Sequence, residues 1–191
     1  MSFVGLDVGG TYLKAAWLAG GRVDGPVHRL SVPSFLDTSG PERELDPAAL
    51  MASVLALLDE AIGNSVPQGI LVTGQMAGVA FTNSEGRGVA PIITWQDTRV
   101  TDLEAIRREL SSAEIARLGE SIRVGLPLVT LNAMGVPAEA RLTSLIGYVA
   151  GSLSNTFASR VHTTDAASWG LLDVSRGSWS AHATRLAGIR Q

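Results

Sequence analysis

The start of the chain, up to Val32, contains three runs of apolar and β-forming residues, separated by short turns that each contain a glycine pair. The runs cover residues 3–6, 12–18 and 23–32, and the turns contain Gly9-Gly10 and Gly20-Gly21. Strands joined by such short turns must lie side by side and run in opposite directions. The sequence therefore predicts an antiparallel meander of three strands at the N-terminus.

Helical and strand patterns alternate after the meander. A helix is predicted from Asp46, which suits an N-cap, to Gly63, because apolar residues recur at helical spacing between them. Residues 69–73 form a short buried strand, and residues 79–82 and 89–93 form a hairpin. Later elements are helical patterns at 101–119 and 142–153, short strands at 159–164 and 170–174, and a last helix capped by Ser180. We expect an α/β domain with a mixed sheet flanked by helices.

Composition limits the class of protein. The 191 residues are 46% hydrophobic and 17% charged, which can fill a core and argues against disorder. The net charge is −3 and the basic residues are scattered, which argues against a nucleic-acid partner. The chain has no cysteine, hence no disulfide, and no apolar run of the ~20 residues that a bilayer requires. We expect a soluble protein with no membrane partner, and a cytoplasmic location is compatible with the composition.

The turn after the first strand has the residues of a phosphate site. Gly9 and Gly10 leave room for backbone N–H groups to converge on phosphate oxygens. Asp7 can hold a magnesium ion through waters, and Thr11 can add a hydroxyl donor. Lys14, the only lysine of the chain, suits a position beside phosphate. The alternatives are a tight hairpin with a solvated aspartate and a lysine that stands there by chance.

Four segments of the chain resemble motifs of the FGGY family of carbohydrate kinases. The Asp-Val-Gly-Gly-Thr turn at residues 7–11 resembles the first phosphate motif of the actin-like ATPase superfold, which includes this family. Gly-Gln-Met-Ala-Gly at 74–78 resembles Gly-Gln-Met-His-Gly, and Pro-Ile-Ile-Thr-Trp-Gln-Asp-Thr-Arg at 91–99 resembles Pro-Ala-Ile-Leu-Trp-Asn-Asp-x-Arg. The segment at 164–173 resembles Ser-Asp-Ala-Ala-Gly-Thr followed by Leu-Asp. The four occur in the family's order, and sedoheptulokinases and xylulokinases look most similar.

The resemblance implies an actin-like ATPase (ribonuclease H-like) fold and ATP-dependent phosphorylation of a ketose or polyol, such as sedoheptulose or xylulose, with ATP and Mg²⁺ as cofactors. In the family, the sugar lies between the Gln-Met loop, the Trp-x-Asp segment and a later aspartate. The residues that match the ATP-phosphate site are Asp7, Gly9, Gly10, Thr11 and Lys14, with Asp7 as the metal ligand. The residues that match the sugar site are Gln75, Met76, Ala77, Trp95, Asp97, Arg99 and Asp165.

Several of the sugar-site residues also have structural explanations. Asp97 and Arg99 could form a local charge pair that caps the helix near Thr101. Met76 and Trp95 could lie in the core. Asp165 could cap a turn.

The chain departs from the family in two respects. Ala77 stands where the family has a histidine, which removes one hydrogen-bond partner of the sugar. The family's general base, an aspartate in a Gly-Gly-Gly-Asp segment, is expected beyond Gln191 with the C-terminal ATP-binding domain, since the chain contains no Gly-Asp dipeptide. We therefore expect residues 1–191 to be an incomplete N-terminal domain, inactive alone. It would expose apolar surface meant for its missing partner domain and could form a homodimer.

Two other functions fit part of the sequence. The Asp-Val-Gly-Gly-Thr turn also fits the ROK, or glucokinase-like, sugar kinases, although their zinc-binding cysteines are absent and they do not explain the Trp-x-Asp segment. A non-catalytic sugar-binding or sensing module with the same fold would be consistent with Ala77 and with the absent base.

Overall fold

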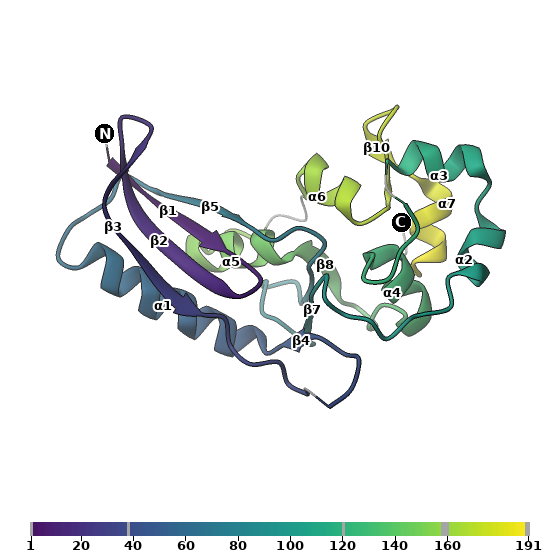
Figure 1. Cartoon of the computed structure of the whole chain (residues 1–191), viewed down its shortest axis with the longest axis horizontal. Coiled ribbons are helices and arrows are strands. Elements are labelled where there is room, and N and C mark those ends of the chain that lie inside the picture. The colour runs from purple at the N-terminus through teal and green to yellow at the C-terminus, as the bar shows by residue number, and fades with distance from the viewer. Residues whose placement is uncertain (1, 38, 120, 158–160, 190–191) are drawn as a thin grey trace.

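The computed structural model describes all residues except 1, 38, 120, 158–160 and 190–191. Its elements form two regions that lie side by side along the long axis of the molecule (Figure 1). The sheet region comprises β1 (Ser2–Val8), β2 (Tyr12–Ala19), β3 (Arg22–Ser31), α1 (Pro47–Ile62), β5 (Ile70–Gly74) and α5 (Leu145–Ser154). The helical region comprises α2 (Glu104–Glu109), α3 (Ser112–Leu118), α4 (Pro127–Met134), α6 (Thr163–Ser168), β9 (Leu172–Asp173), β10 (Ser178–Trp179) and α7 (Ala181–Leu186).

The predicted meander is confirmed and belongs to a mixed sheet. Its strand order is β3-β2-β1-β5, in which β1 and β5 run parallel and the other pairs are antiparallel. Gly20 and Gly21 join β2 to β3 with φ angles of 57° and 76°, which glycine adopts without the steric cost that other residues meet. The mixed sheet therefore follows from local turn chemistry plus one parallel strand added from farther along the chain.

Helix α1 covers one face of this sheet and begins and ends where the sequence predicts. The Asp46 side chain accepts a hydrogen bond from the Ala49 amide at 2.8 Å, and Gly63 follows the last turn with a φ of 56°. Its buried residues pack on the buried residues of the sheet to form one hydrophobic core, which includes Val4, Leu6, Val8, Leu13, Leu50, Val54, Leu57 and Leu58.

A second sheet, here called the dividing sheet, separates this core from that of the helical region. Its order is β4-β7-β6-β8, with β4 at Glu44–Leu45, β7 at Ile92–Ile93, β6 at Val79–Thr82 and β8 at Arg141–Ser144. Successive residues of a strand point to opposite faces. Val79 and Phe81 of β6 accordingly join the core of the helical region, and Ala80 joins the core of the sheet region. Both faces of β6 are therefore buried.

The helix predicted at 142–153 is confirmed from Leu145 on, whereas the strand predicted at 159–164 is wrong where the structure describes it. Leu142 lies in β8, opposite Phe81, and helix α5 begins only after Ser144, whose hydroxyl accepts from the Gly147 amide at 2.9 Å. Thr163 and Thr164 were expected in a strand but begin helix α6, while residues 159 and 160 lie outside the described part of the chain. In both places a capping side chain decides where the helix starts, and apolar spacing does not.

The remaining predictions hold in part. The helical pattern at 101–119 is two helices, because Ser111 and Glu114 form a capping box that starts α3. Strand pairing at 170–174 is confined to β9. The Ser180 cap of the last helix is confirmed, since its hydroxyl accepts from the Ala183 amide at 3.3 Å. Helix α4 was not predicted.

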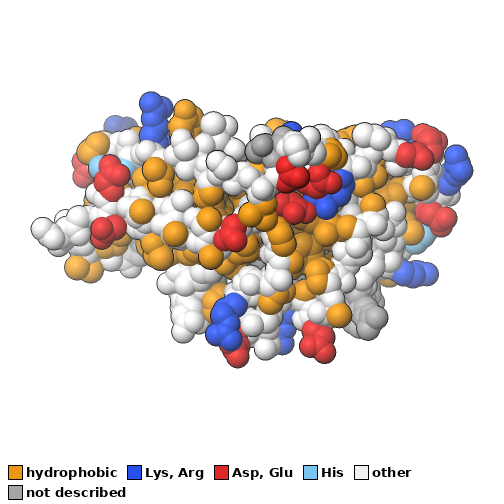
Figure 2. Space-filling model, turned by 90° about the horizontal axis from the view of Figure 1, so that it is seen from below, with side chains coloured by type: hydrophobic (Ala, Val, Ile, Leu, Met, Phe, Trp, Pro, Cys, Tyr) orange, Lys and Arg blue, Asp and Glu red, His pale blue; other side chains and the backbone are white. Residues whose placement is uncertain are grey.

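Figure 2 shows the molecule from below, where acidic and basic side chains lie in small mixed groups between hydrophobic ones. Among the described residues, no helix combines the length and the apolar character that crossing a bilayer requires.

Candidate functional site

Asp7 and Lys14 face each other at the end of the first hairpin. Residue 7 lies between Lys14 on β2 and Thr73 on β5 in the sheet register. The Lys14 ammonium is 3.2 Å from Asp7 Oδ2, and the two side chains remain 48% and 39% exposed. Ion pairs this exposed contribute little to stability, roughly 0–1 kcal/mol. The pair therefore leaves both charges available to a metal ion and a phosphate.

Only some backbone amides of the glycine turn between Asp7 and Lys14 are available to a ligand. The Gly9 amide already donates to the Tyr12 carbonyl at 3.1 Å, and a Cβ on Gly9 would lie only 2.7 Å from that oxygen. The turn is therefore closed by Gly9 and needs glycine there. The amides of Gly10 and Thr11 make no hydrogen bond with any described residue. They are the donors that could bind a phosphate oxygen.

Gln75 lies beside this turn because β5 runs parallel to β1. Its amide N–H donates to the Val8 carbonyl at 2.9 Å, and its side-chain Nε2 donates to the Gly9 carbonyl at 3.3 Å. The other side-chain atom, Oε1, is buried and has no hydrogen-bond partner among the described residues. The loop that begins at Gln75 is thus fastened to the phosphate turn by both backbone and side chain.

The Trp-x-Asp segment reaches the same place. A Cβ built on Gly10 would lie 3.5 Å from Trp95 Nε1 and 3.6 Å from Gln75 Oε1, so the side chains of Trp95 and Gln75 meet beside Gly10. Trp95 is 46% exposed, and Met76, next to Gln75, is 56% exposed. The alternative that these two residues fill the core is therefore wrong. Three segments far apart in the sequence converge at Gly10.

Asp97 and Arg99 form a charge pair within the Trp-x-Asp segment, in which Asp97 is buried and Arg99 is partly buried. Arg99 Nε and Nη2 donate to the Asp97 carboxylate at 2.9 and 2.7 Å, and the amides of Arg43 and Arg99 donate to it at 3.0 and 3.1 Å. The Asp97 side chain is fully buried. Arg99 Nη2 also lies 2.5 Å from Glu44 Oε1 on β4. This network fastens the segment that carries Trp95 to the dividing sheet.

The network also sets the charge state of its members. Burial by itself would raise the pKa of Asp97, but the hydrogen bonds from Arg99 and from the Arg43 amide outweigh it and lower that pKa. Hydrogen bonding to Asp97 outweighs burial for Arg99 and raises its pKa. Both groups are therefore ionised at neutral pH. The pair does not cap a helix near Thr101, because α2 begins at Glu104, and direct contact of Asp97 or Arg99 with a sugar stays a prediction.

Helix α6 packs on the loop that follows Gln75. The Ala77 amide donates to Ser168 Oγ at 3.1 Å, and Ser168 Oγ donates to the Asp165 carbonyl at 2.8 Å. Ala77 has a φ of 59°, which costs an alanine energy and marks a conformation that the surroundings impose. Asp165 is buried, with 7% of the residue exposed. Ser168 was not predicted as a site residue. The one signal for it in the sequence is a hydroxyl group that follows small apolar residues.

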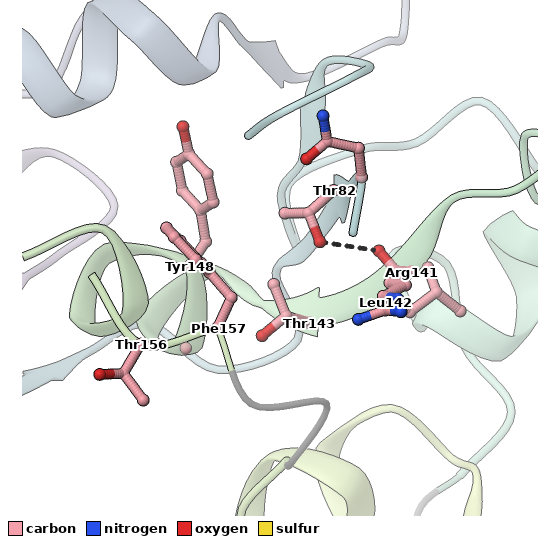
Figure 3. A pocket seen from close by; sticks show the side chains of 9 residues that line it. Thr82, Arg141, Leu142, Thr143, Tyr148, Thr156 and Phe157 are labelled. Atoms are coloured by element: carbon pink, nitrogen blue, oxygen red, sulfur yellow. Dashed lines mark hydrogen bonds between the residues drawn. The ribbon is translucent and has the colours of Figure 1, made fainter. Parts of the chain in front are cut away.

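A small hollow lies apart from these residues. Figure 3 shows it between β6, β8 and α5, where Thr82 Oγ1 donates to the Arg141 carbonyl at 3.4 Å. Its volume of about 30 Å³ is room for about one water molecule, which is too small for a sugar. The residues predicted to bind phosphate and sugar line an open surface where the phosphate turn, the Gln75 loop and the Trp95 segment meet.

Comparisons with known proteins bear on the family and the fold of the chain. The family model described as the N-terminal domain of the FGGY family of carbohydrate kinases matches residues 2–191. A search of curated proteins found no match. Among solved structures, xylulose kinase from Rhodospirillum rubrum superposes with a TM-score of 0.85 at 25% identity, over 99% of this chain and 41% of that one.

Two further structures show the same fold. Gluconate kinase from Lactobacillus acidophilus has a TM-score of 0.83 at 20% identity and covers 99% of this chain and 40% of its own. Plasmodium falciparum glycerol kinase with ADP has a TM-score of 0.83 at 14% identity, over 98% of this chain and 41% of its own. The present chain thus spans about two fifths of the length of the structures it matches. The expected actin-like fold is confirmed, and the family match argues against the ROK alternative.

Proposed function

The chain belongs to the FGGY family of carbohydrate kinases, whose N-terminal domain it matches, and from this premise we propose that the intact protein transfers phosphate from ATP to a ketose or related polyol. The observation that carries the proposal is the convergence at Gly10. The side chains of Gln75 and Trp95, which belong to segments matched to the sugar site, lie against the turn matched to the phosphate site. Phosphoryl transfer requires this proximity of acceptor and phosphates.

The phosphate turn fits ATP with magnesium. Mg²⁺ usually keeps several waters and takes one or two carboxylates together with phosphate oxygens. Asp7 supplies one half-exposed carboxylate, and the open amides of Gly10 and Thr11 lie beside it. Asp7 would hold the ion while Lys14 turns from Asp7 to a phosphate oxygen. Bound Mg²⁺ supplies positive charge that stabilises the phosphates during transfer.

The acceptor is proposed from the same surface and from the relatives. The three matched kinases are named for xylulose, gluconate and glycerol, which all carry several hydroxyl groups. We propose a ketose such as xylulose or sedoheptulose for this protein. Ala77 offers no side-chain hydrogen bond where the family has a histidine, so the acceptor would be held by one contact fewer. Because the reaction consumes ATP, we place it in the cytoplasm.

We further propose that a larger protein completes the active site. The general base and the second ATP-binding domain would belong to a part corresponding to the unmatched length of the relatives. The face of the first sheet opposite α1 carries the Asp7–Lys14 pair at one end, and the rest of this face is largely apolar. This face has a hollow of about 310 Å³. Gly5 and Ala16 form its base, and its sides are formed by Leu18 and Val27 and, opposite them, by Leu71. The missing domain would cover it, and in its absence two copies would associate through it.

The test is ATP turnover by the intact protein against a panel of ketoses and polyols. We expect turnover with one sugar and a loss of at least about a hundredfold in Asp7→Ala, because positioning of the metal and phosphates carries most of the rate. Residues 1–191 alone should show no turnover and should sediment as a dimer that Leu71→Glu dissociates. Robust phosphorylation by residues 1–191 alone would contradict the proposed division of the site.

A second candidate is a sugar-binding module without catalysis, which Ala77 specifically favours. Sugar binding by the intact protein, with no turnover of any sugar, would support that reading. Restoring the family's residue with Ala77→His would then be the first variant to test for turnover.

A further inference from the structure

A hollow on the helical region lies apart from the site described above. Its volume is about 240 Å³, several times the share of one water molecule in the liquid, which is about 30 Å³. Residues of α3, of the β9–β10 hairpin and of α7 line it, and Figure 1 shows these elements together at the end of the molecule farther from the first hairpin. No residue of the phosphate turn, the Gln75 loop or the Trp95 segment lines it. The hollow therefore has room for a small molecule that the proposed active site does not hold.

Trp179 gives this hollow an apolar wall. It lies on β10, opposite Leu172 of β9, and its ring packs on that of Trp169 with the two centroids 6.4 Å apart. Trp169 is 1% exposed, whereas Trp179 is 44% exposed. The buried ring thus fixes the position of Trp179 and leaves part of the surface of Trp179 open at the hollow. Aromatic walls are typical of small-molecule sites and favour ligands that have an apolar face.

Asp173 lines the same hollow, with one carboxylate oxygen engaged and the other free. Oδ1 accepts from the Ser175 hydroxyl at 2.6 Å and from the amides of Ser175 and Arg176 at 3.1 and 3.2 Å. Oδ2 lies 3.6 Å from Arg117 Nε and 3.8 Å from Arg176 Nε, which is too far for a hydrogen bond, and 10% of the Asp173 side chain remains exposed. Among the described residues, neither Oδ2 nor the two guanidinium groups form a hydrogen bond. One acceptor and several donors in the lining are therefore free for a ligand.

The charges that line the hollow balance, apart from His182. Glu114 Oε1 lies 2.8 Å from His182 Nδ1, and Glu114 Oε2 accepts from the Ser111 amide and hydroxyl at 2.9 and 2.7 Å. These bonds lower the pKa of Glu114 to about 2, and the Ser175 hydroxyl lowers the pKa of Asp173, so both carboxylates are ionised at neutral pH. Two carboxylates therefore stand against two guanidinium groups. An uncharged ligand suits such a lining better than an anion or a cation does.

An uncharged cyclic sugar matches each of these features. Its ring carries C–H groups that form an apolar face, which suits contact with Trp179. Its hydroxyl groups both donate and accept, which suits Asp173 Oδ2 on the one hand and the guanidinium groups on the other. An apolar ring without hydroxyl groups would leave those polar groups unpaired, and a phosphate would bring further negative charge beside Asp173 and Glu114.

We propose that the hollow between α3, the β9–β10 hairpin and α7 is a second carbohydrate site, at which a cyclic sugar lies on Trp179 and binds Asp173 and Arg117 through its hydroxyl groups. Arg176, at the rim, supplies further donors. The inference goes beyond the proposed function, because it concerns a ligand held away from the phosphate turn. Since no residue of that turn lines the hollow, the sugar is bound there without being phosphorylated.

The experiment follows the indole N–H signal of Trp179 in nitrogen–proton NMR spectra, which reports the hollow independently of turnover. The protein has four tryptophans, and Trp179→Phe assigns the signal. Glucose and xylose as cyclic sugars, glycerol as an acyclic polyol and inorganic phosphate are titrated into the 191-residue protein. We expect the Trp179 signal to shift in a saturable way with the two cyclic sugars, to shift less with glycerol, and to stay in place with inorganic phosphate.

Two variants test the polar part of the site through the same signal. Arg117→Met and Arg176→Met remove hydrogen-bond donors and keep most of the apolar stem. Each should weaken the binding of cyclic sugars at least about fivefold, which corresponds to one lost hydrogen bond. The control Arg108→Met, exposed on α2 and outside the hollow, should change it less than about twofold. All three side chains are exposed, so the variants should fold, which circular dichroism checks.

The outcomes decide the second site without deciding the proposed function. A Trp179 signal that moves with neither cyclic sugar, or that moves with inorganic phosphate alone, would overturn the second site. An affinity for cyclic sugars that is unchanged in both arginine variants would overturn it as well. Saturable shifts that are weakened in either variant and kept in Arg108→Met support it. ATP turnover by the intact protein tests the proposed function separately, because the two sites share no residue.

Discussion

The sheet region and the helical region bury separate hydrophobic cores by different means. In the sheet region, the long helix α1 covers a sheet made of long strands, and its core includes Leu6, Leu13 and Leu57. In the helical region, helices of six to eight residues surround Trp169 and Leu128, and no long element dominates. The dividing sheet contributes to both cores through alternate residues of β6. The two regions therefore share one wall, and the site lies where their loops meet.

The difference has a functional consequence. The phosphate turn and Gln75 extend from strands of the sheet region, which hold them by ladder hydrogen bonds. Asp165 and Ser168 belong to the short helix α6 and reach the Gln75 loop through one hydrogen bond to Ala77. A change of angle between the two regions would therefore move Asp165 and Ser168 relative to the phosphate turn and Gln75. We expect the dividing sheet to limit such movement.

The largest expected effect tests whether the regions unfold together. Leu57→Ala in one core and Leu128→Ala in the other each leave a cavity at a residue no more than 1% exposed, and each should cost about 3 kcal/mol of unfolding free energy. Because β6 serves both cores, either change should shift the urea transition of both regions. Fluorine NMR of labelled tryptophan reports Trp17 and Trp169 separately. Transitions that move independently would show that the dividing sheet does not couple the cores.

A slightly smaller effect is expected at the charge pair that fastens the Trp95 segment. Asp97→Asn should cost about 3 kcal/mol or less, because it leaves the partly buried Arg99 with Glu44 as its one remaining carboxylate partner among the described residues. The pKa of Asp97 is lowered by folding, so its contribution is present above pH 3.8, the ordinary value, and is lost as the pH falls below it. Urea unfolding at pH 7 and pH 3 checks both points. A variant as stable as the wild type at pH 7 would contradict this role.

Alanine substitutions at two glycines with the same φ angle distinguish the cost of backbone strain from the cost of a steric collision. Gly125 and Gly135 share a φ of 75°, but a Cβ on Gly125 would collide with the Trp95 carbonyl, while one on Gly135 would meet no described atom within 4 Å. Gly135→Ala should cost about 1 kcal/mol from strain, and Gly125→Ala about 2 kcal/mol or more. Thermal unfolding measures both. Equal losses would mean that contact with the Trp95 segment does not matter.

The smallest effect concerns acid stability of the helical region. Glu114 Oε1 on α3 lies 2.8 Å from His182 Nδ1 on α7. Hydrogen bonds from His182 and Ser111 lower the pKa of Glu114 from 4.5 to about 2. A lowered pKa stabilises the fold above pH 4.5 and ceases to do so as the pH falls toward 2. Glu114→Gln should therefore flatten the dependence of stability on pH in this window. An unchanged slope, measured by circular dichroism, would assign the acid sensitivity to other carboxylates.

The candidate site was predictable to the extent that its residues sit in short continuous motifs. The phosphate turn, the Gln75 loop and the Trp95 segment were each identified along the chain. Their meeting at Gly10 was not, because it depends on the parallel pairing of β1 with β5 and on the Asp97–Arg99 network. Ser168 escaped prediction for the same reason, since its bond to Ala77 joins residues 91 positions apart.

The sequence by itself determined the elements whose signals are local. Glycine turns set the meander, Asp46 and Gly63 bounded α1, and Ser180 capped the last helix, because turn and cap chemistry acts over a few residues. The tertiary structure alone decided that Leu142 is in a strand, since it pairs with Phe81. It alone also decided that Asp97 is buried against Arg99, that Trp95 is exposed, and that Gln75 Oε1 has no partner in the part of the chain that the structure describes. These facts depend on contacts between segments far apart in the sequence, and local propensities carry no information about such contacts.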